Sequence, residues 1–301
     1  AFSPLDGFLK KNDFESVLYT MRLSTGVPWP LPVVLDVAED EARRLEEGND
    51  VALRDGDGGI VGLLHLEEKY TYSKEVFSQK VFGTLDQSHP GVFAVTRMKP
   101  ILLGGKITLL KRRFSETKQY ELTPRQTRRL FEERGWSRVV GFHTRNVIHR
   151  SHEYIQLEGM RRASADGLFV HPVVVKKNKG DFHALPIIKS YELMTSRFYP
   201  KDKVLFGAYA TFSRYAGPRE ALFTAICRKN FGCSHFIVGR DHTGVGAFYG
   251  PKASHEIFDD FPDLGIVPIR FDRVFYSDRL KEHVHEGDDV AEHAENEKLH
   301  L

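Results

Sequence analysis

The sequence predicts an α/β protein in which a β-rich amino-terminal module precedes a parallel sheet with helices between its strands. Residues 1–121 alternate short apolar runs with turn residues, a pattern typical of β-hairpins. Residues 122–276 alternate strand-like runs with segments of helical length, which indicates a right-handed parallel sheet. Polar clusters follow two of those runs, and ligands bind at the carboxyl ends of parallel strands. We therefore expect the functional site in the second part.

The first module is predicted to contain strands at residues 33–37 and 60–66. Residues 55–59 read D-G-D-G-G and favour a hairpin turn, because a calcium loop is longer and includes a downstream glutamate. A helix is predicted to begin with Thr123 as its N-cap and Pro124 in its first position. We place the boundary between the two domains at this helix start.

The second domain is predicted to hold strands at residues 139–142, 168–175, 203–209 and 236–238. Helices are predicted after His152, over residues 187–198 and over residues 217–230. Residues 277–301 carry eight acidic residues and almost no apolar periodicity. We interpret them as a polar tail or as the start of a C-terminal subdomain.

Composition favours an enzyme of the cytoplasm. The chain has 43 basic and 41 acidic residues, a net charge of +2 that argues against nucleic acid or an anionic membrane as partner. No apolar run approaches the ~18 residues of a membrane span. The two cysteines, Cys227 and Cys233, indicate core packing in a reducing compartment.

The first polar cluster, residues 143–153, lies where a strand is predicted to turn into a helix. Free backbone N–H groups and the helix dipole favour an anion there. Arg145 and Arg150 add cationic forks, and His149 and His152 would share one face of the first turn. A solvated helix cap or a zinc pair are the alternatives, but zinc needs a third ligand and the arginines would repel it. A polyphosphate site is the simpler interpretation.

The second polar cluster, residues 239–246, also leaves a strand end. Its glycines allow backbone amides to approach a bound group. An ordinary loop, with an ion pair between Arg240 and Asp241, is the alternative. Residues 176–181 form a third polar segment, which is equally consistent with a surface turn.

These clusters resemble a known family. Residues 143–153, H-T-R-N-V-I-H-R-S-H-E, are similar to the Q-T-R-N-P-x-H-R-x-H-E motif of ATP sulfurylases. Residues 213–220 and 239–246 resemble the family's M-R-Y-A-G-P-R-E and G-R-D-H-A-G-P-G segments in the same order. Residues 4–9 and 21–32 resemble its amino-terminal signatures, and residues 176–181 match its K-x-G-D loop. The resemblance implies a PUA-like first domain and a Rossmann-like nucleotidyltransferase domain.

The resemblance implies transfer of AMP from MgATP to sulfate, which gives adenosine 5′-phosphosulfate and pyrophosphate reversibly and without a covalent enzyme intermediate. It implies that Arg145 and His143 bind sulfate together with the Thr243 backbone. Magnesium would arrive with ATP, with no metal or zinc bound by the protein itself, and the chain would form a homo-oligomer, a dimer or larger. The implied catalytic residues are Thr144, Arg145, Asn146, His149 and His152. The implied ATP contacts are His143, Thr144, Arg145, Asn146, His149, His152, Gly239, Arg240, Asp241, His242 and Val274.

The sequence departs from the family pattern in four places: His143 replaces glutamine, Val147-Ile148 stand where Asn-Pro is usual, Ser213 replaces methionine and Thr243 replaces alanine. Because an imidazole donates more hydrogen bonds when protonated, we expect anion affinity to strengthen below about pH 6.5. The departures leave two alternatives open. One is a related nucleotidyltransferase that uses another oxyanion; the other is a degenerate nucleotide-binding subunit without catalysis.

Overall fold

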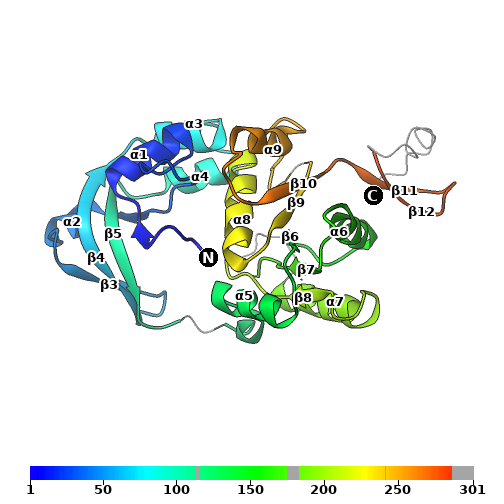
Figure 1. Ribbon diagram of the computed structural model, residues 1–301. Coiled ribbons are helices and arrows are strands. Elements are labelled where there is room, and N and C mark those ends of the chain that lie inside the picture. The colour runs from blue at the N-terminus through cyan, green and yellow to red at the C-terminus, as the bar shows by residue number, and fades with distance from the viewer. Residues whose placement is uncertain (113–114, 175–182, 241, 287–301) are drawn as a thin grey trace.

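The computed structural model describes the whole chain except residues 113–114, 175–182, 241 and 287–301. Figure 1 shows an antiparallel sheet with its helices beside an α/β body, with helix α8 between the two. No helix among the described residues is both long and apolar enough to cross a membrane.

The amino-terminal module is built on a five-stranded antiparallel sheet in the order β1-β5-β4-β3, with β2 also paired to β5. Its strands are β1 Gly7–Phe8, β2 Leu35–Val37, β3 Asp50–Arg54, β4 Ile60–Thr71 and β5 Ile101–Leu109. The predicted hairpin turn joins β3 to β4, where the Asp55 carboxylate accepts a hydrogen bond of 2.8 Å from the Gly59 backbone. The sheet buries one face, through residues such as Leu64 and Leu66.

The same module contains helices that the sequence reasoning missed. They are α1 Lys11–Thr20, α2 Glu39–Arg44, α3 Lys74–Phe82 and α4 Pro90–Thr96. Helix α1 buries Phe14, Val17 and Leu18, which contribute to a core shared with α3 and α4. The module is therefore a sheet with a helical layer rather than hairpins alone.

Helix α5, Pro124–Glu133, begins as predicted. The Thr123 hydroxyl accepts a hydrogen bond from the Gln126 backbone at 3.3 Å, and the Gln126 side chain accepts one from the Thr123 backbone at 2.9 Å. This capping box, with Pro124 in the first helical position, satisfies backbone donors that would otherwise lack partners.

The α/β body contains a five-stranded parallel sheet in the order β10-β9-β6-β7-β8. Its strands are β6 Val139–Phe142, β7 Gly167–Val170, β8 Val204–Phe206, β9 His235–Gly239 and β10 Val267–Phe271. The helices are α6 Arg150–Arg162, α7 Ala184–Arg197, α8 Pro218–Phe231 and α9 Ala253–Glu256, with short 3-10 turns η1 Lys118–Tyr120 and η2 Ile257–Asp260.

Both faces of this sheet are covered. Phe236 and Val238 of β9 belong to the core that includes α8, whereas Ile237 between them packs in the core beneath α6. The chain winds outward from β6 to β8 and then crosses back to β9 on the other side of β6. The neighbouring strands β6 and β9 therefore mark the switch point at which open α/β sheets bind ligands.

Two strands are shorter than predicted. Strand β7 ends at Val170 rather than at residue 175, and residue 172 is a proline, which has no N–H for the sheet. Strand β8 ends at Phe206, before Gly207. Beyond these ends the two segments continue side by side outside the named strands, with an isolated bridge between Val173 and Tyr209.

The first residues of the predicted tail belong to a β-hairpin. Strands β11 Val274–Ser277 and β12 Glu282–His285 form an antiparallel hairpin. His285 is buried, and its Nε2 accepts a hydrogen bond of 2.8 Å from the Asp272 backbone. The interpretation of residues 277–286 as a solvated tail is therefore wrong, while the remaining tail lies outside the described residues.

Candidate active site

The two polar clusters converge on one cavity. Residues 143–146 follow β6, residues 242–244 follow β9, and both segments line a cavity of about 280 Å³ at the switch point. We call this cavity the anion cleft. Its lining residues are Phe142, His143, Thr144, Arg145, Asn146, His152, Ile155, Ser213, Ile237, Gly239, His242, Thr243 and Gly244.

The turn after β6 is held by its own threonine. Thr144 is buried, and its hydroxyl accepts a hydrogen bond of 3.1 Å from the Asn146 backbone. The Arg145 guanidinium lies 5.3 Å from the centre of the Tyr215 ring, in cation–π range. Asn146 is exposed at the mouth. The turn thus presents a permanent charge beside an amide.

Helix α6 starts at Arg150, with His149 in the N-cap position. The His149 and His152 rings stack with centroids 3.8 Å apart, as expected for residues three apart in the first turn. His152 lines the cleft, whereas His149 does not line it and is exposed. Arg150 does not line the cleft; its exposed side chain pairs with Glu153 at 2.8 Å. Of the two arginines in this cluster, only Arg145 lines the cleft.

The loop after β9 is anchored by His242. Its ring is buried, with Nε2 2.9 Å from the Thr224 hydroxyl of α8. The ring centroids of His143 and His242 are 5.3 Å apart, so the two loops meet through these imidazoles. Thr243 has φ 55°, a left-handed conformation that is uncommon for threonine and typical of functional loops.

Some predicted site residues lie elsewhere. Arg240 is exposed and Val274 begins β11, and neither lines the cleft. Asp241 and the loop at residues 176–181 lie outside the described residues. The structure therefore brings together eight of the predicted residues at the cleft: His143, Thr144, Arg145, Asn146, His152, Gly239, His242 and Thr243.

The cleft histidines are neutral near pH 7. Burial, followed by the charge of Arg228, holds the pKa of His143 well below its ordinary value. Burial, followed by the charge of His149, lowers the pKa of His152 to about 3. Burial, followed by the charge of Arg228, lowers the pKa of His242 to about 3. This direction argues against the expectation that protonation of His143 strengthens anion binding below about pH 6.5; the pH dependence of anion affinity stays a prediction. These imidazoles act as neutral donors.

A second arginine lies directly behind the cleft, and sequence reasoning missed its role. Arg228 of α8 is fully buried, with Nη2 donating to the His171 carbonyl at 2.8 Å and the guanidinium 4.7 Å from the Tyr209 ring centre. Its Nε and Nη1 have no hydrogen-bond partner among the described residues. A Cβ on Gly141 of β6 would lie 2.9 Å from its Cγ, so the arginine touches the strand that leads into the cleft. A basic residue within a predicted helix gives no hint of such burial.

Comparison with known proteins places this geometry in a family. The sequence model of the ATP-sulfurylase family matches residues 118–301, and that of the PUA-like domain matches residues 1–112. The chain belongs to the ATP-sulfurylase family. The predicted fold class, a PUA-like domain followed by a parallel-sheet α/β domain, is confirmed.

Curated relatives in the ATP-sulfurylase family are named sulfate adenylyltransferase. The protein of Synechococcus sp. (strain JA-3-3Ab) is 46% identical over 278 residues, which cover 91% of this chain and 70% of that protein. The protein of Pyrococcus abyssi is 47% identical over 300 residues, with coverage of 100% and 76%. The protein of Thermococcus onnurineus is 48% identical over 275 residues, with coverage of 91% and 71%.

A solved structure, the hexameric APS kinase from Thiobacillus denitrificans, superposes with a TM-score of 0.72. At 23% identity this likeness concerns the fold alone. The match covers 95% of this chain and 50% of that chain.

Three of the departures from the ATP-sulfurylase motifs lie together, whereas Val147 and Ile148 do not line the anion cleft. His143, Ser213 and Thr243 all line the anion cleft, although they come from three separate segments.

Proposed function

We propose that the protein is a sulfate adenylyltransferase, which transfers AMP from MgATP to sulfate and releases pyrophosphate. The observation that carries this proposal is the anion cleft, where Arg145 and the His143 and His242 imidazoles meet at the switch point of the parallel sheet. The names of relatives 46–48% identical to the chain support the same activity.

The reaction needs position and charge rather than a protein nucleophile. A sulfate oxygen attacks the α-phosphorus of ATP, the new O–P bond forms, and the bond to the pyrophosphate oxygen breaks in line with it. Two anions must approach each other, so permanent positive charge is the main requirement. Arg145 supplies it at the cleft surface, and buried Arg228 adds to the positive potential from behind β6.

We assign sulfate to Arg145, His143 and the Thr243 backbone. Asn146 would orient oxygens of the α-phosphate, and Thr144 would hold the turn on the side of the leaving group. Neutral His152, supported by the stacked ring of His149, would donate to the β- and γ-phosphates through an N–H group. The Nδ1 atoms of His143 and His152 are buried without a hydrogen-bond partner among the described residues, which leaves capacity for ligand oxygens.

The nucleoside would extend along the loop after β9. We assign it to Gly239, Arg240, Asp241 and His242, with the adenine edge near Val274. Gly239 suits this role because a Cβ there would meet open space, so a ligand can approach its backbone.

Magnesium enters as part of the substrate. Among the described residues no three His, Cys, Asp or Glu side chains are grouped so that they could hold a metal ion. Phosphate oxygens and water would hold the ion, as Mg²⁺ commonly prefers. We further propose a homo-oligomer in the cytoplasm, where Cys227 and Cys233 stay reduced in the core.

Release of pyrophosphate from MgATP, measured with a panel of oxyanions, tests the proposal. We expect release to depend on sulfate and to fall at least about a hundredfold in Arg145→Met, since loss of one such donor costs about 3 kcal/mol of barrier. Arg150→Met is the matched control, because Arg150 belongs to the same segment but lies outside the cleft. It should stay within about threefold of the wild-type rate, because an exposed ion pair contributes little.

Two results would contradict the proposal. Turnover with a phosphonate or a phosphate ester but not with sulfate would favour another acceptor. Binding of ATP without turnover on any anion would favour a non-catalytic nucleotide-binding subunit.

A further inference from the structure

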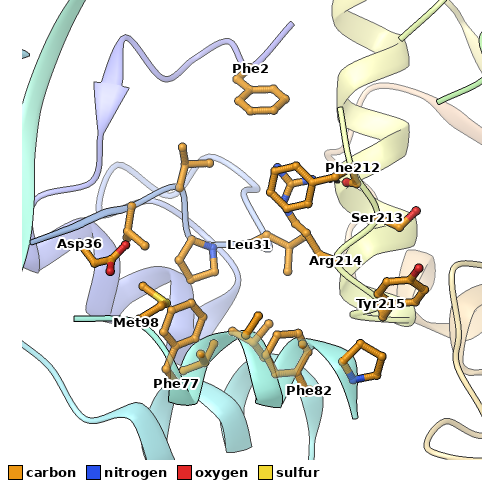
Figure 2. A pocket seen from close by; sticks show the side chains of 18 of the residues that line it. Phe2, Leu31, Asp36, Phe77, Phe82, Met98, Phe212, Ser213, Arg214 and Tyr215 are labelled. Atoms are coloured by element: carbon orange, nitrogen blue, oxygen red, sulfur yellow. Dashed lines mark hydrogen bonds between the residues drawn. The ribbon is translucent and has the colours of Figure 1, made fainter. Parts of the chain in front are cut away.

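A second and larger cavity lies between the PUA-like module and the α/β domain (Figure 2). Its volume is about 550 Å³, within the range of small-molecule sites. We call it the interdomain chamber. Phe77 and Phe82 of α3 lie along one side and Phe2 along the opposite side, with Leu31 between them. An apolar space of this size stabilises a bound hydrocarbon group by taking it out of water.

The two ends of the chamber differ. At one end lies Asp36, whose carboxylate accepts a hydrogen bond of 2.7 Å from the Lys99 backbone. At the other end lie Ser213, Arg214 and Tyr215 (Figure 2). Arg145 is also among the lining residues. The chamber is therefore apolar along its length and cationic at one end.

The cationic end of the chamber adjoins the anion cleft, because Arg145 and Ser213 line both cavities. The Arg214 guanidinium adds a second charge there; it lies 4.4 Å from the Phe212 ring centre and donates to the Phe212 carbonyl at 3.1 Å. Ser213, which lines both cavities, stands where the family motif has the longer methionine. A group bound at Arg145 would thus lie next to both cavities.

We propose that the interdomain chamber binds the hydrocarbon part of an organic oxyanion, a sulfonate or phosphonate with an alkyl or aryl tail, whose head takes the place of sulfate at Arg145. The head would receive charge-assisted hydrogen bonds, and the tail would lie against the apolar walls. This proposal rests on the proposed function in assigning sulfate to Arg145. Such a ligand excludes sulfate and acts as a competitive inhibitor.

The test uses methanesulfonate, propanesulfonate and hexanesulfonate, with 1-hexanol as the uncharged probe. Direct binding is measured by titration calorimetry, and inhibition is measured at varied sulfate in the pyrophosphate-release assay. Each buried methylene should tighten binding about fourfold, the equivalent of about 0.8 kcal/mol. Hexanesulfonate should therefore bind at least about a hundredfold more tightly than methanesulfonate and compete with sulfate.

Ala94 offers a way to fill the chamber without touching the catalytic residues. It lies on α4, lines the chamber and is exposed, so a larger side chain enters empty space rather than the core. In Ala94→Phe we expect hexanesulfonate to bind at least about tenfold more weakly, with methanesulfonate and turnover of sulfate unchanged. The matched control is Phe93→Trp, which enlarges an exposed residue of the same helix outside the chamber. This control should leave the affinity for all three sulfonates unchanged.

Ser213→Met tests the junction between the cavities. We expect this substitution to weaken the binding of hexanesulfonate more than that of methanesulfonate, because only the longer ligand must extend past this residue.

Affinity that does not rise with chain length, or that rises equally in Ala94→Phe, would overturn the proposal. Binding of 1-hexanol as tight as that of hexanesulfonate would also overturn it, because the head would then play no part. If the protein shows no turnover with sulfate but binds hexanesulfonate with the expected chain-length and Ala94→Phe dependence, the chamber assignment is supported and the proposed function fails.

Discussion

At the scale of the residue, the permanent positive charge in and behind the anion cleft comes from arginines, because burial keeps its histidines neutral. Arg145 is at the surface of the cleft and Arg228 lies behind it, fully buried. The charge of Arg228 contributes to lowering the pKa of His143, His171 and His242. The site is therefore organised to donate hydrogen bonds to anions with little change in its own protonation.

Neutral buried histidines make the stability of the protein sensitive to acid. Burial, then Arg228, holds the pKa of His171 well below its ordinary value, and His171 is 0% exposed. Between that lowered pKa and about 6.5 the unfolded chain binds more protons, so stability is full above pH 6.5 and decreases as the pH falls. The decrease should approach about 1.4 kcal/mol per pH unit for each such histidine.

Replacing one of these histidines isolates its contribution. His171 packs among the rings of Phe169, Tyr209 and Phe231, so His171→Phe keeps an aromatic ring, and the backbone carbonyl that binds Arg228 remains. Urea denaturation from pH 7.5 to 5 should show a shallower loss of stability in this variant. An unchanged slope would mean that His171 is charged in the folded protein.

The sequence predicted much of the site at this scale. The positions of Arg145, Asn146 and His242 followed from motifs at strand ends, since parallel strands bring their carboxyl ends to one edge. The protonation of His143 could not be predicted, because it depends on burial and on the charge of Arg228, which is distant in sequence. The position of Arg228 behind the cleft could not be predicted either, because it depends on how distant segments pack together.

At the scale of the element, a helix start was predicted most reliably where the residues that determine it lie within a few positions of one another. The start of α5 was predicted from Thr123 and Pro124 alone, and the capping box confirms it. The ends of β7 and β8 were placed too late, because an apolar run continues past Pro172 and Gly207 although the sheet does not. Helices α1 and α3 were missed because their apolar residues are also compatible with short strands.

The capping box makes a quantitative prediction. Thr123→Ala should lower the free energy of unfolding by about 1 kcal/mol, because the Gln126 backbone N–H loses its acceptor. Thr123→Ser keeps the hydroxyl and serves as the control. Helix α5 does not line the anion cleft, so turnover should be unchanged in both variants. Chemical denaturation measures the effect, and equal stability of the two variants would contradict this role for Thr123.

At the scale of the whole molecule, the PUA-like module and the α/β domain are joined by α8. Arg219 of this helix donates hydrogen bonds to the carbonyls of Val17, Leu18 and Pro30 at 2.8–3.1 Å, and so caps the end of α1. Arg22 forms a bidentate pair with Asp263 at 2.6 and 2.9 Å. The aromatic rings of Trp29 and Phe223 complete the contact, with centroids 5.6 Å apart.

This interface predicts that both parts unfold together. Arg219→Met should lower the free energy of unfolding by about 3 kcal/mol and separate the calorimetric transition into two, since the carbonyls of α1 lose a charged donor. Arg129→Met, which removes an exposed arginine from α5, should change stability by less than about 1 kcal/mol. A single unshifted transition in Arg219→Met would show that the contact does not couple the two parts.

The most direct test of the account is a crystal structure of the protein with adenosine 5′-phosphosulfate bound. The account predicts that the sulfate group lies against Arg145 and His143 and that the α-phosphate lies between the turn after β6 and the loop after β9. Density for the ligand at any other place, such as the interdomain chamber, with the anion cleft vacant, would contradict it.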